Sequence, residues 1–180
     1  GSDTRTEAEL ELSSLDGTNG FKINGVDAGD YSGFSVSSAG DVNGDGIDDI
    51  IIGAAYADNH DKTSAGKSYV VFGSDTRTEA ELELSSLDGS NGFKINGVDA
   101  GDRSGSSVSS AGDVNGDGID DIIIGGREWV GESYVLFGST TRTAAAIELS
   151  SLDGSNGFKI NGIDADDNSG VSVSSAGDVN

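Results

Sequence analysis

Hydrophobic residues along the chain come in short groups separated by glycine, asparagine and aspartate. Residues 34–40 alternate apolar and polar side chains, the pattern of a half-buried strand. Residues 47–54 contain consecutive isoleucines and end near glycine, and residues 67–73 are rich in β-branched and aromatic side chains. Residues 19–25 hold two apolar residues around a lysine, between Asn-Gly pairs. The pattern therefore predicts four short β-strands.

The four predicted strands belong to an internal repeat. Residues 1–54 match residues 73–126 at an offset of 72 and differ at four positions, and a looser third copy begins at Gly138. The strand patterns accordingly return at 91–97, 106–112, 119–126 and 132–138, and further strands are expected near 157–162 and 170–177. Between them, the stretch "TRTEAELELSSL" is faintly helical, but its "ELELS" part alternates like a strand. Four short strands in each repeat are typical of β-propeller blades.

We therefore expect an all-β protein with tandem four-stranded blades of β-propeller type. The strand count predicts two full blades plus flanking strands, too few to close a ring, because propellers have about four to eight blades. The chain should be an excerpt of a longer protein, whose outer strands need partners. The expected divisions are a fourth strand of a preceding blade and linker at 1–32, blades at 33–98 and 105–163, and the first strand of a truncated blade at 170–180.

The nine-residue segment "DVNGDGIDD" occurs at 41–49 and again at 113–121, and it begins a third time at Asp178. Oxygen-bearing residues at its first, third, fifth and ninth positions, with glycine at the sixth, match the spacing of a calcium loop. An EF-hand is excluded, because Ile52 stands where the distal glutamate belongs and strands replace the flanking helices. An acidic turn without metal would leave three carboxylates repelling one another. We therefore predict Ca²⁺ ligands, the Ile residues through their carbonyl groups, at Asp41, Asn43, Asp45, Ile47, Asp49, Asp113, Asn115, Asp117, Ile119, Asp121, Asp178 and Asn180.

The order "SGFSVSSAGDVNGDGIDDIIIGAA…GKSYVVFG" resembles the FG-GAP repeat of integrin α-subunit propellers and their bacterial relatives. Ser32-Gly33 stands where the family has Phe-Gly, and Gly53-Ala54-Ala55 stands where it has Gly-Ala-Pro, so the name-giving Phe and Pro are both missing. The calcium loop itself is intact. The resemblance implies that this loop joins the first two strands of each blade, and that the opposite face, which binds ligand in integrins, carries the variable loops.

Composition narrows the classes of function. A formal net charge of −22 argues against nucleic-acid binding and suits surroundings rich in divalent cations. There is no Cys, so neither disulfides nor thiolate metal sites can form, and no apolar run is long enough for a membrane span. A single His and the lack of a nucleophile motif leave an enzyme without a catalytic triad. We expect a non-enzymatic, acidic protein at the cell surface or outside the cell.

Differences between the copies fall in two connections that should emerge on one face, opposite the calcium loops. We expect ligand contacts there from Tyr31, Phe34, Tyr56, His60, Arg103, Arg127, Glu128 and Trp129. The alternative is that these loops differ between copies because no selection acts on their sequences. The expected function is a calcium-binding extracellular module for adhesion or ligand recognition, with structural Ca²⁺ and a protein or glycan ligand. The alternatives are a purely structural repeat of a matrix, sheath or filament, or a sugar-binding propeller. Further repeats or identical chains are the other expected partners.

Overall fold

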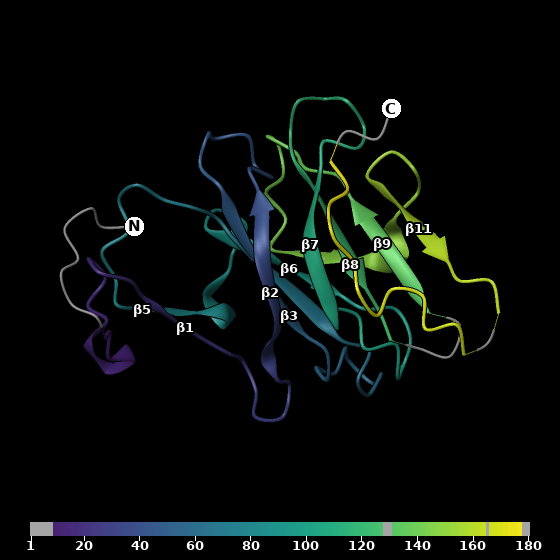
Figure 1. Ribbon diagram of the computed structural model, residues 1–180, viewed down its shortest axis with the longest axis horizontal. Helices are drawn as coiled ribbons and strands as arrows, with labels where there is room; N and C mark the ends of the chain where they lie inside the picture. Colours follow the sequence, from purple (N-terminus) through teal and green to yellow (C-terminus); the bar gives the residue numbers. More distant parts are fainter. Residues whose placement is uncertain (1–8, 128–130, 165, 178–180) are drawn as a thin grey trace.

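The computed structural model describes residues 9–127, 131–164 and 166–177. Apart from three single-turn 3₁₀ helices at Leu12–Ser14, Leu84–Ser86 and Leu149–Ser151, its regular structure is β, as the pattern predicts. The strands, labelled in Figure 1, are β1 Lys22–Asn24, β2 Ser32–Gly40, β3 Asp49–Ala54, β4 Lys67–Val71, β5 Glu81–Glu83, β6 Gly92–Asn96, β7 Ser107–Gly112, β8 Asp121–Gly125, β9 Glu132–Leu136, β10 Ala146–Glu148 and β11 Gly157–Asn161.

Each blade contains four antiparallel strands that lie side by side in chain order, with β5 or β10 passed over before the fourth. In the first sheet the order is β6-β4-β3-β2, and in the second it is β11-β9-β8-β7. Neighbouring strands pair residue against residue, for example Ile51 with Val70 and Ile123 with Val135. These two sheets are the tandem blades that the repeat predicts, and they do not close into a ring.

Two short strands join one repeat to the repeat before it. β10, which precedes β11 in the chain, pairs in parallel with β6 on the outer edge of the first sheet, and β5 pairs in the same way with β1. Both strands lie in the "ELELS" type of segment, and a 3₁₀ turn follows each. The strand and helical tendencies of that segment are thus both realised, one after the other. The parallel pairing across repeats was not predicted from the sequence.

The core lies between the two sheets. Ile51, Val70 and Phe93 of the first sheet meet Ile122 and Ile124 of the second, all nearly fully buried. The opposite face of the first sheet is also covered, because a second cluster packs against residues of β1 and β5; its buried members are Ile52, Ala54, Ala57, Tyr69, Val71, Leu82 and Leu84. Consecutive isoleucines in β3 therefore point to two different cores, which explains a continuous apolar run in place of an alternating one.

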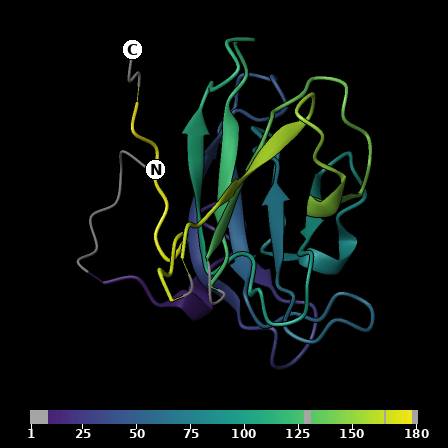
Figure 2. The same ribbon diagram turned by 90° about the vertical axis from the view of Figure 1, so that its right-hand side faces the viewer.

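The predicted strand at 170–177 does not form, so that prediction is wrong. Figure 2 shows this segment as an extended trace without an arrow. It nevertheless lies along the second blade, where the Val173 amide donates to the Ser107 hydroxyl at 3.0 Å. β7 lies against the first blade in a comparable way, with Ser35 Oγ donating to the Gly105 carbonyl at 2.8 Å. Unlike β7, segment 170–177 has no following strand among the described residues to complete a ladder.

Loops gather at two ends of the sheets. Figure 1 shows the 41–48 and 113–120 connections at the upper end and the β1–β2, β3–β4 and β6–β7 connections at the lower end. Identical loops and variable loops thus lie on opposite rims. Within the described ranges, no helix has the length and apolar character needed to cross a membrane.

Candidate metal centre

The loop between β2 and β3 folds around the side chain of its first residue. Asp41 Oδ1 accepts hydrogen bonds from the backbone amides of Gly44 at 2.7 Å and Asp45 at 3.0 Å, and Oδ2 accepts one from Gly46 at 2.8 Å. Gly44 and Gly46 have φ of +74° and +90°, values that glycine adopts without strain. The alternation of aspartate, asparagine and glycine therefore closes the chain around one carboxylate.

The third and fifth loop positions are connected to each other. Asn43 Oδ1 accepts from the Asp45 amide at 2.9 Å, and Asn43 Nδ2 donates to Asp45 Oδ2 at 3.0 Å. The other oxygen of Asp45 accepts from the Ile47 amide at 2.9 Å. The loop thus brings Asp41, Asn43 and Asp45 into one hydrogen-bonded unit.

The loop between β7 and β8 repeats this arrangement. Asp113 accepts from the amides of Gly116 at 2.7 Å, Asp117 at 3.1 Å and Gly118 at 2.8 Å. These backbone hydrogen bonds, first that of Gly118, lower the pKa of Asp113. Asn115 and Asp117 make the same pair of contacts as their counterparts, at 2.9 and 3.0 Å.

The ninth position of each loop is buried. Asp49 accepts hydrogen bonds from the Val42 amide at 3.0 Å and the Gly73 amide at 2.8 Å. Asp121 accepts from Val114 and Gly138, both at 2.8 Å. Burial raises the pKa of Asp49 to about 6, and it raises the pKa of Asp121 as well. These carboxylates connect each loop to a glycine that lies two residues after the third strand of its sheet.

A ready-made cluster of ligands is not present. In the described part of the chain, no three His, Asp or Glu side chains are grouped as they would be around a metal ion. Asp178 and Asn180, the predicted ligands of the third loop, lie outside the described residues. What the two complete loops offer is a set of hard oxygen donors, which is the chemistry that Ca²⁺ prefers.

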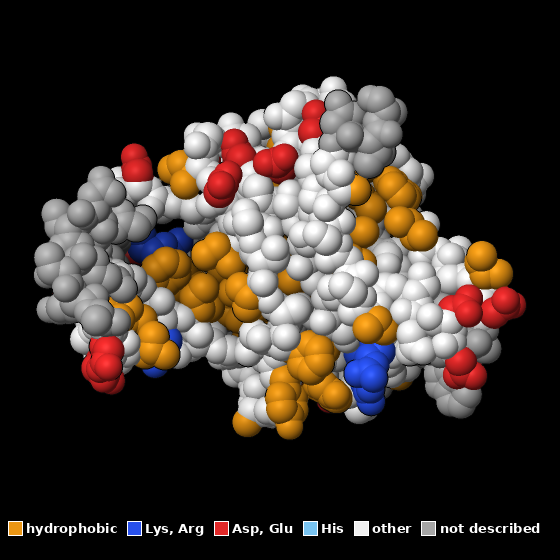
Figure 3. All heavy atoms as spheres, in the orientation of Figure 1, with side chains coloured by type: hydrophobic (Ala, Val, Ile, Leu, Met, Phe, Trp, Pro, Cys, Tyr) orange, Lys and Arg blue, Asp and Glu red, His pale blue; other side chains and the backbone are white. Residues whose placement is uncertain are grey.

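The first loop is also held by the second repeat. The Asp41 amide donates to Asp120 Oδ2 at 3.0 Å, the Asp120 amide donates to the Asp41 carbonyl at 3.3 Å, and the Ser139 amide donates to the Val42 carbonyl at 2.9 Å. Figure 3 shows acidic side chains gathered along this upper rim. Sequence reasoning did not single out Asp120, because its partner is a backbone amide in a different repeat.

On the opposite rim, four of the predicted ligand-contact residues meet. The ring of Tyr56 lies 5.1 Å from that of Tyr31 and 6.0 Å from that of Phe34, and the Arg103 guanidinium lies 5.0 Å from its centroid. Tyr31 and Phe34 are exposed. Figure 3 shows hydrophobic and basic side chains side by side along the lower rim. We call Tyr31, Phe34, Tyr56 and Arg103 the aromatic patch.

Three of the predicted contact residues have an uncommon backbone conformation. Tyr31 and Arg103 both have left-handed backbones, with φ of +54° and +50°, as does His60 at +57°. Such conformations are uncommon for large side chains and are maintained by the surrounding structure.

The remaining predicted contacts do not join the aromatic patch. His60 and Arg127 are exposed, but no ring or cation contact links either to the patch. Glu128 and Trp129 lie outside the described residues.

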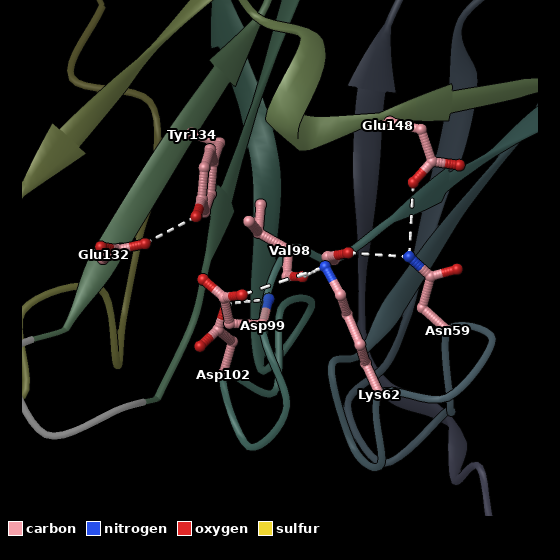
Figure 4. Close-up of polar contacts among 9 residues, drawn as sticks. Asn59, Lys62, Val98, Asp99, Asp102, Glu132, Tyr134 and Glu148 are labelled. Carbon is pink, nitrogen blue, oxygen red and sulfur yellow. Dashed lines mark hydrogen bonds and ion pairs between the residues drawn. The ribbon is translucent and has the colours of Figure 1, made fainter.

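The structure adds a polar connection that the sequence analysis missed. Asn59, in the variable β3–β4 loop, donates to the Gly97 carbonyl at 3.0 Å and to Glu148 at 3.3 Å (Figure 4). Lys62 of the same loop contacts the Val98 carbonyl and lies 3.9 Å from an Asp99 carboxylate oxygen. The variable loop is therefore fastened to the second connection of this rim. The signal in the sequence is that Glu148 repeats Glu83 at the middle of the "ELELS" type of segment.

Comparison with known proteins identifies the repeats. The FG-GAP repeat family matches residues 32–71 and 104–136, which contain the first three strands of each blade. Similar proteins include integrin alpha-PS2 of Drosophila melanogaster, 32% identical over 127 residues, which are 66% of this chain and 8% of the relative. Integrin alpha-5 of Xenopus laevis is 33% identical over 105 residues, 58% of this chain and 9% of the relative.

A third relative, integrin alpha pat-2 of Caenorhabditis elegans, is 35% identical over 117 residues, 62% of this chain and 10% of the relative. The chain therefore spans a tenth or less of the length of these curated relatives. Both matched segments include the loop between the first and second strands of a blade, and the match agrees with the resemblance seen in the sequence. The chain thus carries two FG-GAP repeats, one matched at 32–71 and a second at 104–136, and is similar to integrin alpha subunits around them.

Proposed function

We propose that the chain is a calcium-binding extracellular repeat module that displays a ligand-recognition surface. The observation that carries the calcium part is the loop geometry, which is formed twice with the same hydrogen bonds. Amides at the fourth, fifth and sixth positions hold the first carboxylate toward the loop interior. Oδ1 of this carboxylate accepts two of these hydrogen bonds, whereas Oδ2 accepts one and keeps a second lone pair for a cation.

The loops fit Ca²⁺ by the chemistry of their donors. In the first loop Asp41, Asn43, Asp45 and Asp49 would supply side-chain oxygens, and Ile47 would supply its carbonyl. Ca²⁺ takes about six to eight oxygens, so water would complete the shell. The ion would supply positive charge, which offsets repulsion among the carboxylates and the burial of Asp49. Equivalent residues of the second loop make the same set, and Asp178 with Asn180 would begin a third.

An extracellular location follows from the expected affinity and from the family. Loops of extracellular modules bind Ca²⁺ with dissociation constants of about 10⁻⁴ to 10⁻³ M, which suits surroundings rich in calcium. The matched relatives are named integrins, and an adhesion or ligand-binding role comes to this chain from that similarity. Calcium would thus act structurally, at the rim opposite the recognition surface, and no catalytic role is proposed.

The aromatic patch is the proposed recognition surface. Three exposed or half-exposed rings and a guanidinium in mutual contact combine apolar area with a cation. Aromatic residues and arginine are the side chains that dominate the binding energy of protein interfaces. We therefore expect an extracellular protein ligand, and a glycan stacked on the rings is the alternative ligand.

The calcium part can be tested by thermal unfolding. In ~5 mM CaCl₂ each bound ion should stabilise the fold by about 1–2 kcal/mol over the chelated protein, because it binds only the folded state. A double variant, Asp45→Ala with Asp117→Ala, should lose this response, whereas Asp61→Ala, an exposed acid on the opposite rim, should keep it. A melting temperature that does not change across millimolar calcium would overturn the calcium part.

The recognition part needs a separate screen of matrix proteins and glycans against the folded, calcium-loaded chain. Binding that Tyr56→Ser weakens, without a change in the melting temperature, would support the aromatic patch. Retention of glycans alone would favour a sugar-binding propeller. No binding in either screen would reject recognition and favour a structural repeat of a matrix, sheath or filament.

A further inference from the structure

The two predicted calcium loops contact each other. Asp120 lies in the second loop, between the predicted ligands Ile119 and Asp121. Its carboxylate accepts a hydrogen bond from the Asp41 amide at 3.0 Å, and its own amide donates to the Asp41 carbonyl at 3.3 Å. Asp41 is the first predicted ligand of the 41–49 loop. One residue of the second loop therefore holds the backbone of a predicted ligand in the first loop.

A second connection passes through the segment after β9. Asp121, the last predicted ligand of the second loop, accepts a hydrogen bond from the Gly138 amide at 2.8 Å. The amide of the next residue, Ser139, donates to the Val42 carbonyl at 2.9 Å. Val42 follows Asp41 in the chain and is 2% exposed. The predicted ligands of the second loop are therefore connected to the first loop at two points.

The contact between the loops is closely packed. A Cβ on Gly44 would lie 2.6 Å from the Thr140 methyl group, and one on Gly138 would lie 3.1 Å from the Val42 carbonyl oxygen. Because so little space remains, a shift of one loop displaces the other. Both sides of this contact belong to the two repeats of this chain.

We infer that Asp120 couples the two calcium loops, so that occupancy of the second loop raises the affinity of the first for Ca²⁺. With Ile119 and Asp121 engaged as ligands, the residue between them is fixed in place, and its two hydrogen bonds hold Asp41 in the conformation that binds. The first loop then loses less conformational freedom on binding, which raises its affinity. This inference rests on the calcium binding of the proposed function, to which it adds a positioning residue and a regulation of each site by its neighbour.

The coupling is reciprocal and of moderate size. Because binding free energies are linked, occupancy of the first loop raises the affinity of the second by the same factor, and factors of about 5 to 150 are usual. Repulsion between two bound ions opposes the coupling. The negative charge of Asp120, which belongs to one loop and contacts the other, offsets part of that repulsion. We therefore expect a factor near the lower end of this range, about fivefold.

Calcium titration of the full chain, followed by two-dimensional amide NMR, tests the inference because each loop has its own reporter. The amides of Gly46 and Gly118 donate to the first carboxylate of their loops, both at 2.8 Å. Asp117→Asn keeps a side-chain oxygen but removes a charged ligand from the second loop, so that loop should bind Ca²⁺ more weakly. The dissociation constant reported by Gly46 should then rise about fivefold. Asp45→Asn, the same change in the first loop, should raise the constant reported by Gly118 by the same factor.

Variants of Asp120 show whether this residue carries the coupling. With Asp120→Ala, Asp117→Asn should no longer change the dissociation constant reported by Gly46. Asp120→Asn, which keeps an acceptor oxygen for the Asp41 amide, should restore part of the coupling. Asp48 holds the same place in the first loop and is exposed, so Asp48→Ala is the matched control and should leave the coupling factor unchanged.

Three results would overturn the inference. The first is a dissociation constant at Gly46 that Asp117→Asn leaves unchanged or lowers, in which case calcium binding itself would stand. The second is coupling that persists in Asp120→Ala, and the third is an Asp120→Asn variant that behaves like Asp120→Ala. If neither Gly46 nor Gly118 shifts across millimolar calcium, the loops do not bind Ca²⁺, and the proposed function is rejected together with the inference.

Discussion

The two blades have nearly the same sequence and different surroundings. β6 lies between β4 and β10, with Arg142 over Phe93, whereas β11 pairs with β9 alone among the described strands. Of the five residues Gly-Phe-Lys-Ile-Asn that form both strands, four are buried in β6 and four are exposed in β11. Burial in this protein is therefore set by the adjoining repeat and not by the local sequence, as expected of repeats that contact only their neighbours.

The two loops show the same contrast. Val42 in the first loop is 2% exposed, while Val114 at the same place in the second loop is 48% exposed. The difference arises because Asp120 and Ser139 of the second repeat contact the first loop. Each repeat is thus completed by contacts from the next, at the loop rim and at the outer strand.

Removing the repeated phenylalanine should expose this contrast most strongly. Phe93→Ala should destabilise the fold by about 3–5 kcal/mol, because it opens a cavity in the core between the sheets. Phe158→Ala should cost less than about 2 kcal/mol, because its ring is already partly in water. Urea unfolding of the two variants measures both values. Equal losses would contradict the claim that the neighbouring repeat determines the burial.

Glycine substitutions isolate the contact at the loops. Gly40 and Gly112 have φ of +73° and +71°, so Ala should cost each about 1–2 kcal/mol in backbone strain. A Cβ on Gly40 would lie 2.2 Å from an Asp120 carboxylate oxygen, but on Gly112 its nearest neighbour would be 3.9 Å away. Gly40→Ala should therefore lose about 1 kcal/mol more in thermal unfolding, through displacement of Asp120 from the Asp41 amide. Identical melting temperatures would show that this contact contributes nothing.

The carboxylates of Glu148 and Glu83, which end the short strands β10 and β5, should give the smallest difference in stability. The Glu148 carboxylate accepts from both Asn96 and Asn59, at 2.6 and 3.3 Å, whereas the Glu83 carboxylate accepts from Asn24 alone in the described structure. Glu148→Ala should destabilise the chain by about 1–2 kcal/mol and Glu83→Ala by about 0.5–1 kcal/mol. Chemical denaturation compares the two variants, with Glu79→Ala as an exposed control. A larger loss of stability for Glu83→Ala than for Glu148→Ala would contradict this account of the two carboxylates.

Local patterns predicted much of the fold and part of the site. Strand positions follow from apolar periodicity and glycine-rich turns, and both are local properties. The parallel pairing of β5 and β10 could not be predicted, although the segment alternates like a strand, because the partners of Glu81–Glu83 lie almost sixty residues away. Segment 170–177 shows that a local pattern alone does not make a strand. Its residues alternate, but no described strand follows them to form a ladder. Differences between the copies singled out the members of the aromatic patch as candidate contacts, and their role in binding stays a prediction. The hydrogen bonds of Asn59 and Lys62 join residues far apart in the sequence, so no local pattern could indicate them.

The central claim is that the repeated loops bind calcium and that the neighbouring repeat changes their affinity. Isothermal titration calorimetry of Ca²⁺ into the chain tests it directly. The account predicts two sites with affinities in the range of about 10⁻⁴ to 10⁻³ M. The 41–49 loop should fill first, because the Asp120 carboxylate lies beside it and the second repeat holds its shape. Asp41→Ala should remove the tighter site and Asp113→Ala the weaker one. No binding at millimolar calcium, or two sites of equal affinity, would contradict the account.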